Sequence, residues 1–382
     1  MMLIIEEVYL IRKIQHKLIL SNLHPKGALK MSMSNSEKEY FIKNRPHVVI
    51  LGAGASCATI PNGDKNGRKI PAMKGFIEAF GLEKILEKVT INTTSDNLED
   101  IYMELERRSA NEPICAEVQS ELNDAIRKGM NSYCLPDTPT IYDFLILSLR
   151  RKDLIATFNW DPFLVQAYKR VARYTNNLPN ITFLHGNVAV GFCEQDKILG
   201  NAGEKCSYGH ALKSMQLLYP VANKDYTSDA GIAASWRELN KALKIAYMIT
   251  IFGYSAPKSD VQAIEMMKKA WGPVDNREYE QIEVINIGDE ETVIKSWDAF
   301  IHTHHYDYCT SFFDSSLAKY PRRTCDTIFD NTLMCRWSDD SLGFKEGMSF
   351  ENIQELISPL LEDEDSKAER RVMLCNPYVE SM

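Results

Sequence analysis

The 382-residue sequence has no excess of basic residues, because 44 Lys and Arg are outnumbered by 52 Asp and Glu, for a formal net charge of −8. This balance argues against nucleic acid as the main ligand, since phosphate backbones require clustered positive charge. A net charge of −8 is still compatible with a local basic groove. The nine cysteines include no C-x-x-C pair. Their irregular spacing indicates reduced thiols and a cytoplasmic location.

The sequence also lacks a long hydrophobic run, and no stretch approaches the roughly 18 apolar residues of a membrane-spanning helix. The N-terminal stretch is apolar, but Glu6 and Glu7 precede its apolar part, unlike a secretory signal. Its apolar spacing fits a helix that docks on the domain or on a partner. The equal alternative is a translation start at Met31 or Met33, within a linker-like stretch. We expect residues 1–40 to be an extension, helical or disordered.

Short apolar runs alternate with longer helical patterns along the rest of the chain. The strand-like runs are 47–51, 154–158, 181–184, 246–252 and 282–287. Apolar residues recur at helical spacing over 73–131 and 140–149, which predicts a helical insertion over about residues 73–150. Alternating strands and helices predict an α/β fold with a parallel sheet. Ligands of such sheets bind beyond the carboxyl ends of the strands.

The first strand-like run ends in a glycine turn, Gly52-Ala53-Gly54-Ala55-Ser56, of the kind that lets backbone N–H groups approach a phosphate. The dehydrogenase fingerprint is incomplete, because Cys57 stands where a third small residue belongs. Pro61-Asn62-Gly63 limits any following helix to about one turn. No Gly-Lys-Ser/Thr follows, which excludes a Walker A loop. We expect a phosphate-binding turn under a long polar loop; a tight turn without a ligand is the alternative.

Residues suited to chemistry also follow the other strand-like runs. They are Asn159, Asp161, His185, Gly253, Ser255 and Asn286. Because the carboxyl ends of parallel strands meet at one sheet edge, we expect this set to converge there. Together the set can bind a pyrophosphate and a ribose and transfer a proton. Singly, each has a structural explanation, such as an Asx cap formed by Asn159-Trp160-Asp161 or a half-buried histidine at His185.

In chain order, the motifs GAGAS, GRKIPAM, TFNWD, LHGN, GYS and IN resemble those of the sirtuin family over roughly residues 46–290. The resemblance implies a Rossmann-like catalytic domain, residues 41–295, in which NAD⁺ is bound as substrate and its nicotinamide is cleaved off. It implies that Asn159 orients the attacking water and a ribose hydroxyl. It implies that Asp161 binds the nicotinamide amide or stabilises positive charge. The implied general base is His185, whose unperturbed pKa lies near neutrality.

The resemblance also implies the residues that hold NAD⁺. They are Gly52, Ala53, Gly54, Ser56, Ile70, Pro71, Gly253, Ser255 and Asn286. Within this set, Ile70-Pro71 matches the flexible cofactor-binding loop of the family. The pyrophosphate is assigned to the glycine turn and Ser255, and the adenosine ribose to Asn286.

Departures from the family pattern indicate a branch. Protein-deacylating sirtuins carry two C-x-x-C pairs after the His-Gly motif, whereas this region holds only Cys193, Cys206 and His210. A structural zinc site requires four ligands, so we expect neither a zinc ribbon nor a bound metal. Phe158 and Trp160 replace the Gln and Ile that flank the deacylases' Asn. A Trp beside the NAD⁺ site would give a larger, more closed pocket.

This pattern resembles the bacterial sirtuin-like NADases of anti-phage defence that are encoded beside HerA-type ATPases. The implied function is hydrolysis of NAD⁺ to nicotinamide and ADP-ribose, which depletes NAD⁺ in infected cells. Implied partners are further copies of the chain and a HerA-type ATPase, with no sequence-specific nucleic acid and no membrane. The alternatives are an NAD-dependent protein deacylase and a non-catalytic module that senses NAD⁺ or ADP-ribose. Residues 296–382 are expected to form a C-terminal interaction or oligomerisation region.

Overall fold

The structure, a computed structural model, describes residues 44–71, 75–219, 224–256, 260–338, 340 and 342–370. The expected N-terminal extension, residues 1–40, lies outside the described residues. Within the described ranges, no helix has the length and apolar character needed to cross a membrane.

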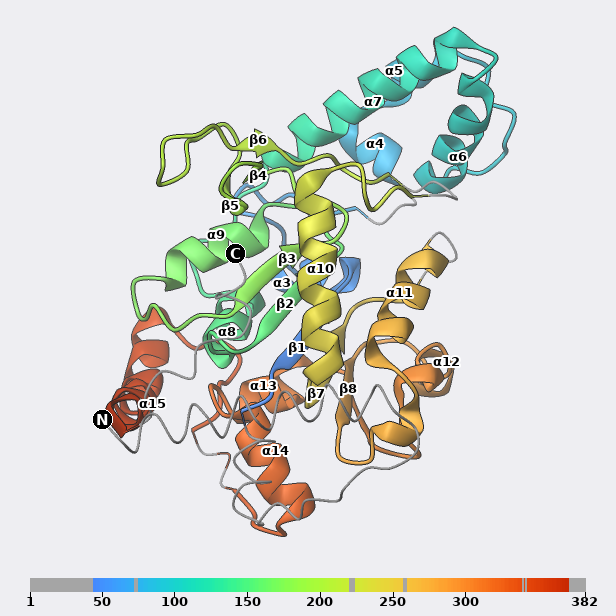
Figure 1. The fold of residues 1–382 in the computed structure, drawn as a ribbon. Helices are drawn as coiled ribbons and strands as arrows, with labels where there is room; N and C mark the ends of the chain where they lie inside the picture. Colours follow the sequence, from blue (N-terminus) through green and yellow to red (C-terminus); the bar gives the residue numbers. More distant parts are fainter. Residues whose placement is uncertain are drawn as a thin grey trace.

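A six-stranded sheet with the order β3-β2-β1-β7-β8-β9 forms the centre of the molecule (Figure 1). Its strands are β1 (His47–Leu51), β2 (Leu154–Thr157), β3 (Asn180–Phe183), β7 (Met248–Phe252), β8 (Gln281–Ile285) and β9 (Tyr306–Cys309). Every neighbouring pair is parallel, which confirms the expected Rossmann-like α/β fold. The order runs outward from β1 in both directions. In such sheets the ligand crevice lies where the order reverses, here between β1 and β7.

Two apolar cores cover the two faces of the sheet. Val49 and Leu51 of β1 belong to one core, and Val48 and Ile50 belong to the other, because successive side chains of a strand point to opposite faces. The first core includes residues of α8 (Ile141–Ser148), α9 (Phe163–Val171), α13 (Ser316–Lys319) and α15 (Phe350–Arg370). The second includes residues of α10 (Ala230–Ile245), α11 (Val261–Trp271) and α12 (Glu290–Lys295). Burial on both faces explains why the strands are continuous apolar runs.

The helical pattern before β2 folds largely into an arm that extends from the body (Figure 1). The arm consists of α4 (Phe76–Phe80), α5 (Glu83–Leu86), α6 (Leu98–Ser109) and α7 (Pro113–Asn131). Asn97 caps the start of α6 by accepting a hydrogen bond from the N–H of Glu99. Apolar residues of the arm belong to the first core, and Arg127 adds a hydrogen bond to the body by donating to the carbonyl of Met215 at 2.8 Å.

A small antiparallel sheet with the order β5-β4-β6 follows β3. Its strands are β4 (Val190–Cys193), β5 (Ile198–Asn201) and β6 (Lys213–Ser214). The sequence pattern does not predict these strands, because each is very short and the residues between them are polar.

The chain beyond residue 295 continues the central sheet. Strand β9 pairs with β8, and α14 (Thr324–Leu333) packs beneath the sheet, where Thr324 Oγ1 lies 2.8 Å from Nδ1 of His47. Short 3₁₀ turns complete this half of the molecule: η2 (Val274–Asn276), η3 (Asp298–Phe300) and η4 (Phe312–Asp314). The boundary expected between 295 and 296 therefore does not coincide with a break in the fold, because the described part of 296–370 completes the sheet and its core.

Candidate active site

The glycine turn joins β1 to α3 (Ala53–Thr59) and packs against the end of β7. The N–H of Gly52 donates to the carbonyl of Phe252 at 3.0 Å, and the N–H of Gly54 donates to that of Gly253 at 2.9 Å. A Cβ on Gly52 would lie only 2.5 Å from Cα of Tyr254, so only glycine fits. Helix α3 has seven residues, about two turns, and is longer than the single turn expected from the sequence.

Gly253 makes the tightest of these contacts, and its substitution tests whether the glycine turn packs against the end of β7. Its φ of +60° disfavours any side chain, and an added Cβ would lie 2.3 Å from the backbone nitrogen of Ala55. We expect Gly253→Ala to lower the free energy of unfolding by about 2–4 kcal/mol, measured by urea denaturation. Gly203→Ala is the matched control, because Gly203 has a φ of +82° with open space around it. Equal losses in the two variants would contradict the packing of this turn against β7.

The side chains of Ser56 and Asn159 share one hydrogen-bond network. Nδ2 of Asn159 donates to Oγ of Ser56 at 2.9 Å and to the carbonyl of Gly52 at 2.8 Å. Ser56 Oγ donates to Oδ2 of Asp161 at 2.6 Å and lies 2.9 Å from the hydroxyl of Tyr142. The ends of β1 and β2 therefore bring three predicted site residues together, and α8 supplies Tyr142, which the sequence did not identify.

Asp161 is buried and serves two purposes. Burial raises the pKa of its carboxyl to about 6, while the hydrogen bond from Ser56 opposes this shift. Its Oδ1 accepts from the N–H of Phe163 at 3.1 Å, at the start of α9. Within Asn159-Trp160-Asp161, the Asx-type contact at the start of α9 is thus made by Asp161, while the amide of Asn159 points into the network.

His185 lies in a second cluster, enclosed by aromatic rings. The ring of Phe158 packs edge-on at 4.7 Å between centroids, and the ring of Tyr226 lies at 6.0 Å. The side chain is only 6% exposed, and its Nε2 has no hydrogen-bond partner among the described residues. Burial lowers the pKa of His185 to about 4. The imidazole is therefore a neutral base near pH 7, although its pKa does not lie near neutrality as the sequence had led us to expect.

Asp260 is the charged neighbour of His185, and the sequence did not identify it as part of the site. Its Oδ1 lies 3.6 Å from Nε2 of His185 and accepts from Nζ of Lys224 at 2.7 Å. Its Oδ2 accepts from the hydroxyl of Tyr254 at 2.8 Å. The Asp260 carboxylate raises the pKa of His185, whereas the Lys224 ammonium lowers it. The predicted catalytic residues thus form two clusters, one around Asn159 and Asp161 and the other around His185.

The remaining predicted residues form the outer part of the site. Ala53, Gly54 and Ser255 are exposed, whereas Ser56, Asp161 and His185 are buried. Asn286 follows β8, and its Oδ1 accepts from the N–H of Gly288 at 2.9 Å. The loop that ends in Ile70 and Pro71 is anchored by Asp64, which accepts hydrogen bonds from Arg68. The ring of Trp160 packs against that of Tyr219, with 5.1 Å between ring centroids. The larger, more closed pocket that we expect beside Trp160 stays a prediction.

Comparison with known proteins found structural neighbours among Sir2 enzymes. No protein-family model and no curated protein matched. A mutant Sir2 homologue in complex with 2′-O-acetyl ADP ribose has a TM-score of 0.37 at 16% identity, covering 79% of this chain and 98% of its own. A Sir2 homolog–NAD complex has a TM-score of 0.30 at 14% identity, and the match covers 80% of this chain and 96% of that structure's chain. A structure concerned with the mechanism and regulation of Sir2 enzymes gives 0.36 at 11% identity, covering 86% and 100%. At such low scores, the chemistry has to be judged from the residues of this chain.

Proposed function

We propose that this chain is an NAD⁺ glycohydrolase that releases nicotinamide and ADP-ribose. One observation carries the proposal. Asn159, Asp161 and Ser56 share a largely buried hydrogen-bond network at the carboxyl ends of β1 and β2 in a Rossmann-like sheet, and a neutral His185 follows the neighbouring strand. Dinucleotides bind at this end of the sheet in folds of this strand order. The exposed glycine turn is suited to the pyrophosphate, and the buried side chains to the reacting end.

The proposed reaction needs only these side chains and water. The bond from C1′ to the nicotinamide nitrogen breaks with both electrons going to the ring, which leaves neutral, while the ribose develops oxocarbenium character. The carboxylate of Asp161 stabilises this positive charge, and Asn159 positions the water. Water then forms the new bond to C1′ and transfers a proton to Nε2 of His185, which makes no competing hydrogen bond within the described part of the chain. Asp260 stabilises the resulting imidazolium.

The enclosure of His185 favours hydrolysis over protein deacylation. Phe158 stacks on Tyr254 at 4.3 Å and packs edge-on against His185 and Trp236, so aromatic rings occupy the space around the imidazole. Water is small enough to act in such a site, whereas an acylated lysine side chain must displace one of the rings. The intact Asn159 and His185 argue against a module that only senses the nucleotide.

Release of nicotinamide by the purified protein tests the proposal. We expect NAD⁺ to be converted to nicotinamide and ADP-ribose in equal amounts without any peptide, as followed by chromatography. Nicotinamide release that requires an acylated peptide and yields acyl-ADP-ribose would instead establish a deacylase. Binding of NAD⁺ or ADP-ribose without any cleavage, alone or with a HerA-type ATPase, would establish a sensing module.

We further propose that the activity serves anti-phage defence by depleting NAD⁺, in a homo-oligomer with a HerA-type ATPase. The support is the motif resemblance described above, together with the physical need for restraint, because a freely active NADase would be toxic. A buried His185 is consistent with a restrained state that a partner relieves. Co-purification with a neighbouring ATPase, and cellular NAD⁺ measured during infection, would test this extension.

A further inference from the structure

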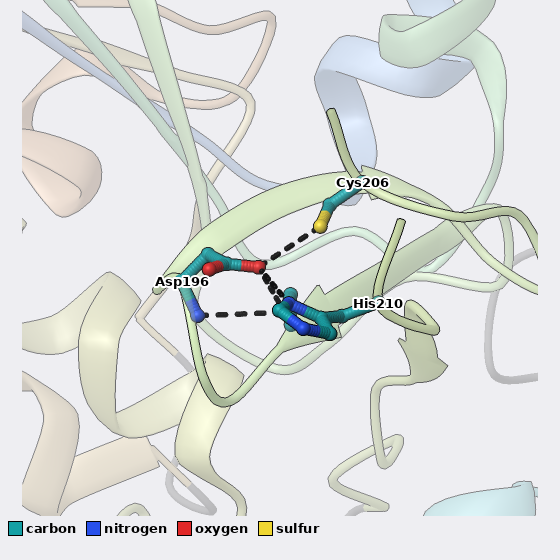
Figure 2. A group of neighbouring side chains, drawn as sticks. Asp196, Cys206 and His210 are labelled. Atoms are coloured by element: carbon teal, nitrogen blue, oxygen red, sulfur yellow. Dashed lines mark hydrogen bonds and ion pairs between the residues drawn. The ribbon is translucent and has the colours of Figure 1, made fainter. Parts of the chain in front are cut away.

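Four potential metal ligands converge in the small β5-β4-β6 sheet, outside the proposed active site. Cys193, Asp196, Cys206 and His210 each place one ligand atom so that all four atoms lie within 4.8 Å of one another. Figure 2 shows Asp196, Cys206 and His210 pointing toward one another from two separate turns. The cysteine and histidine residues of this region supply only three potential ligands, Cys193, Cys206 and His210. Asp196 supplies the fourth.

The backbone holds these ligands in two tight turns. Cys193 and Asp196 are three residues apart in the turn between β4 and β5, where the N–H of Lys197 donates to the carbonyl of Cys193 at 2.9 Å. Cys206 and His210 close a second turn, where the N–H of Cys206 donates to the carbonyl of His210 at 2.8 Å. Two ligands from each of two short turns is the arrangement that zinc ribbons use.

The side chains already interact as a ligand set. Oδ2 of Asp196 lies 3.0 Å from Sγ of Cys193, 2.9 Å from Sγ of Cys206 and 2.7 Å from Nδ1 of His210. The N–H of Asp196 also points to Sγ of Cys193 at 3.4 Å, a contact that stabilises a thiolate. Tetrahedral zinc needs ligand atoms about 3.3–3.8 Å apart, so movements of about 1 Å suffice to admit the ion.

Cysteines make up most of the small sheet's own apolar cluster. This cluster consists of Cys193, Cys206 and Leu212, while Val190 and Phe192 of β4 pack into the second core of the main sheet and both residues of β6 are exposed. A cluster in which two of the three core residues are cysteines fits a metal-stabilised segment.

We propose that Cys193, Asp196, Cys206 and His210 bind one Zn²⁺ ion as a closed, structural site. Two sulfurs, one imidazole nitrogen and one carboxylate oxygen form a tetrahedral set that zinc prefers over magnesium or calcium. On binding, both thiols release their protons to solvent, and the site carries a net charge of −1. With four protein ligands the ion has no open position, so it fixes the β4–β6 segment and takes no part in the proposed reaction.

Metal analysis of the purified, tag-free protein tests this site. We expect one zinc per chain by mass spectrometry, lost in Cys206→Ser and in Asp196→Ala. Asp196→Cys should retain zinc, because it restores a ligand of the preferred type. Cys134→Ser is the matched control, since the Cys134 thiol is exposed and outside the cluster, and it should leave the zinc content unchanged.

Cobalt provides a readout that does not depend on the variants folding normally. Reduced wild-type protein, stripped of metal and titrated with Co²⁺, should develop the visible bands of tetrahedral cobalt and a sulfur-to-cobalt charge-transfer band. A wild-type protein that binds neither ion would overturn the proposal, as would zinc content unchanged in Cys206→Ser. NAD⁺ cleavage is measured separately, so failure of the proposed enzyme would leave this result intact.

Discussion

His185→Ala is expected to lower the rate of NAD⁺ cleavage by about 100- to 10,000-fold, the range that loss of a general base produces. In the wild type, Nε2 of His185 has no hydrogen-bond partner in the ranges that the structure describes, and burial lowers its pKa to about 4, so the imidazole is unprotonated at neutral pH. The alanine variant keeps Asn159 and Asp161, so binding of NAD⁺ should survive. The measurement is nicotinamide release over time, with NAD⁺ binding followed by calorimetry.

Two companion variants separate catalysis from packing. His185→Gln retains most of the side-chain volume among the aromatic rings but cannot accept and hold the proton at neutral pH, so it should be as inactive as the alanine variant. His304→Ala removes an exposed histidine and should cleave NAD⁺ at the wild-type rate. Near-normal cleavage by His185→Ala with an unchanged melting temperature would exclude His185 as the base.

The central sheet was largely predictable because its strands are buried on both faces. Such strands are continuous apolar runs, and β1, β2, β3, β7 and β8 all fall within or next to the predicted runs. Strand β9 was missed because its sequence, YDYC, alternates at a partly exposed edge and contains no apolar run.

The convergence of Ser56, Asn159 and Asp161 was predictable because parallel strands direct their carboxyl ends to one edge. Tyr142 and Lys224 were not, because each reaches the site from a distant segment with no strand end to mark it. The lowered pKa of His185 could not be predicted from the sequence either, because it depends on how deeply the side chain is buried.

The small sheet weakens one argument drawn from the sequence. The absence of paired cysteines was taken to distinguish this chain from deacylases, yet Asp196 and His210 complete a four-ligand set with the two cysteines. Our proposal of hydrolysis rather than deacylation therefore rests on the aromatic enclosure of His185. That enclosure depends on side-chain packing, which the motif order alone does not reveal.

Asp161→Asn is expected to lower NAD⁺ cleavage at pH 8 by about 100- to 1,000-fold, because it removes the charge that stabilises the oxocarbenium ion. Burial raises the pKa of Asp161 to about 6, so the wild type is itself about tenfold less ionised at pH 5 than at pH 8. The deficit of the variant should therefore shrink about tenfold at pH 5. In the wild type, kcat/KM should fall as the pH drops below about 6, where Asp161 becomes protonated. If Asp161→Asn shows the same fall near pH 6, the fall belongs to another group.

As the pH rises through about 6, the wild type should gain NAD⁺-cleaving activity but lose free energy of unfolding. The folded carboxyl has a pKa of about 6 against an ordinary value of 3.8, so the folded state binds more protons between these values. The free energy of unfolding therefore falls as pH rises through this window, and the full cost is present above pH 6. Asp161→Asn removes a cost of up to about 3 kcal/mol at pH 8, and urea denaturation should show a variant at least as stable as the wild type. Asp137→Asn, at an 82% exposed side chain, should change neither property. A variant that is inactive yet more stable at pH 8 would place Asp161 in the reaction, since a merely structural carboxylate would lose both together.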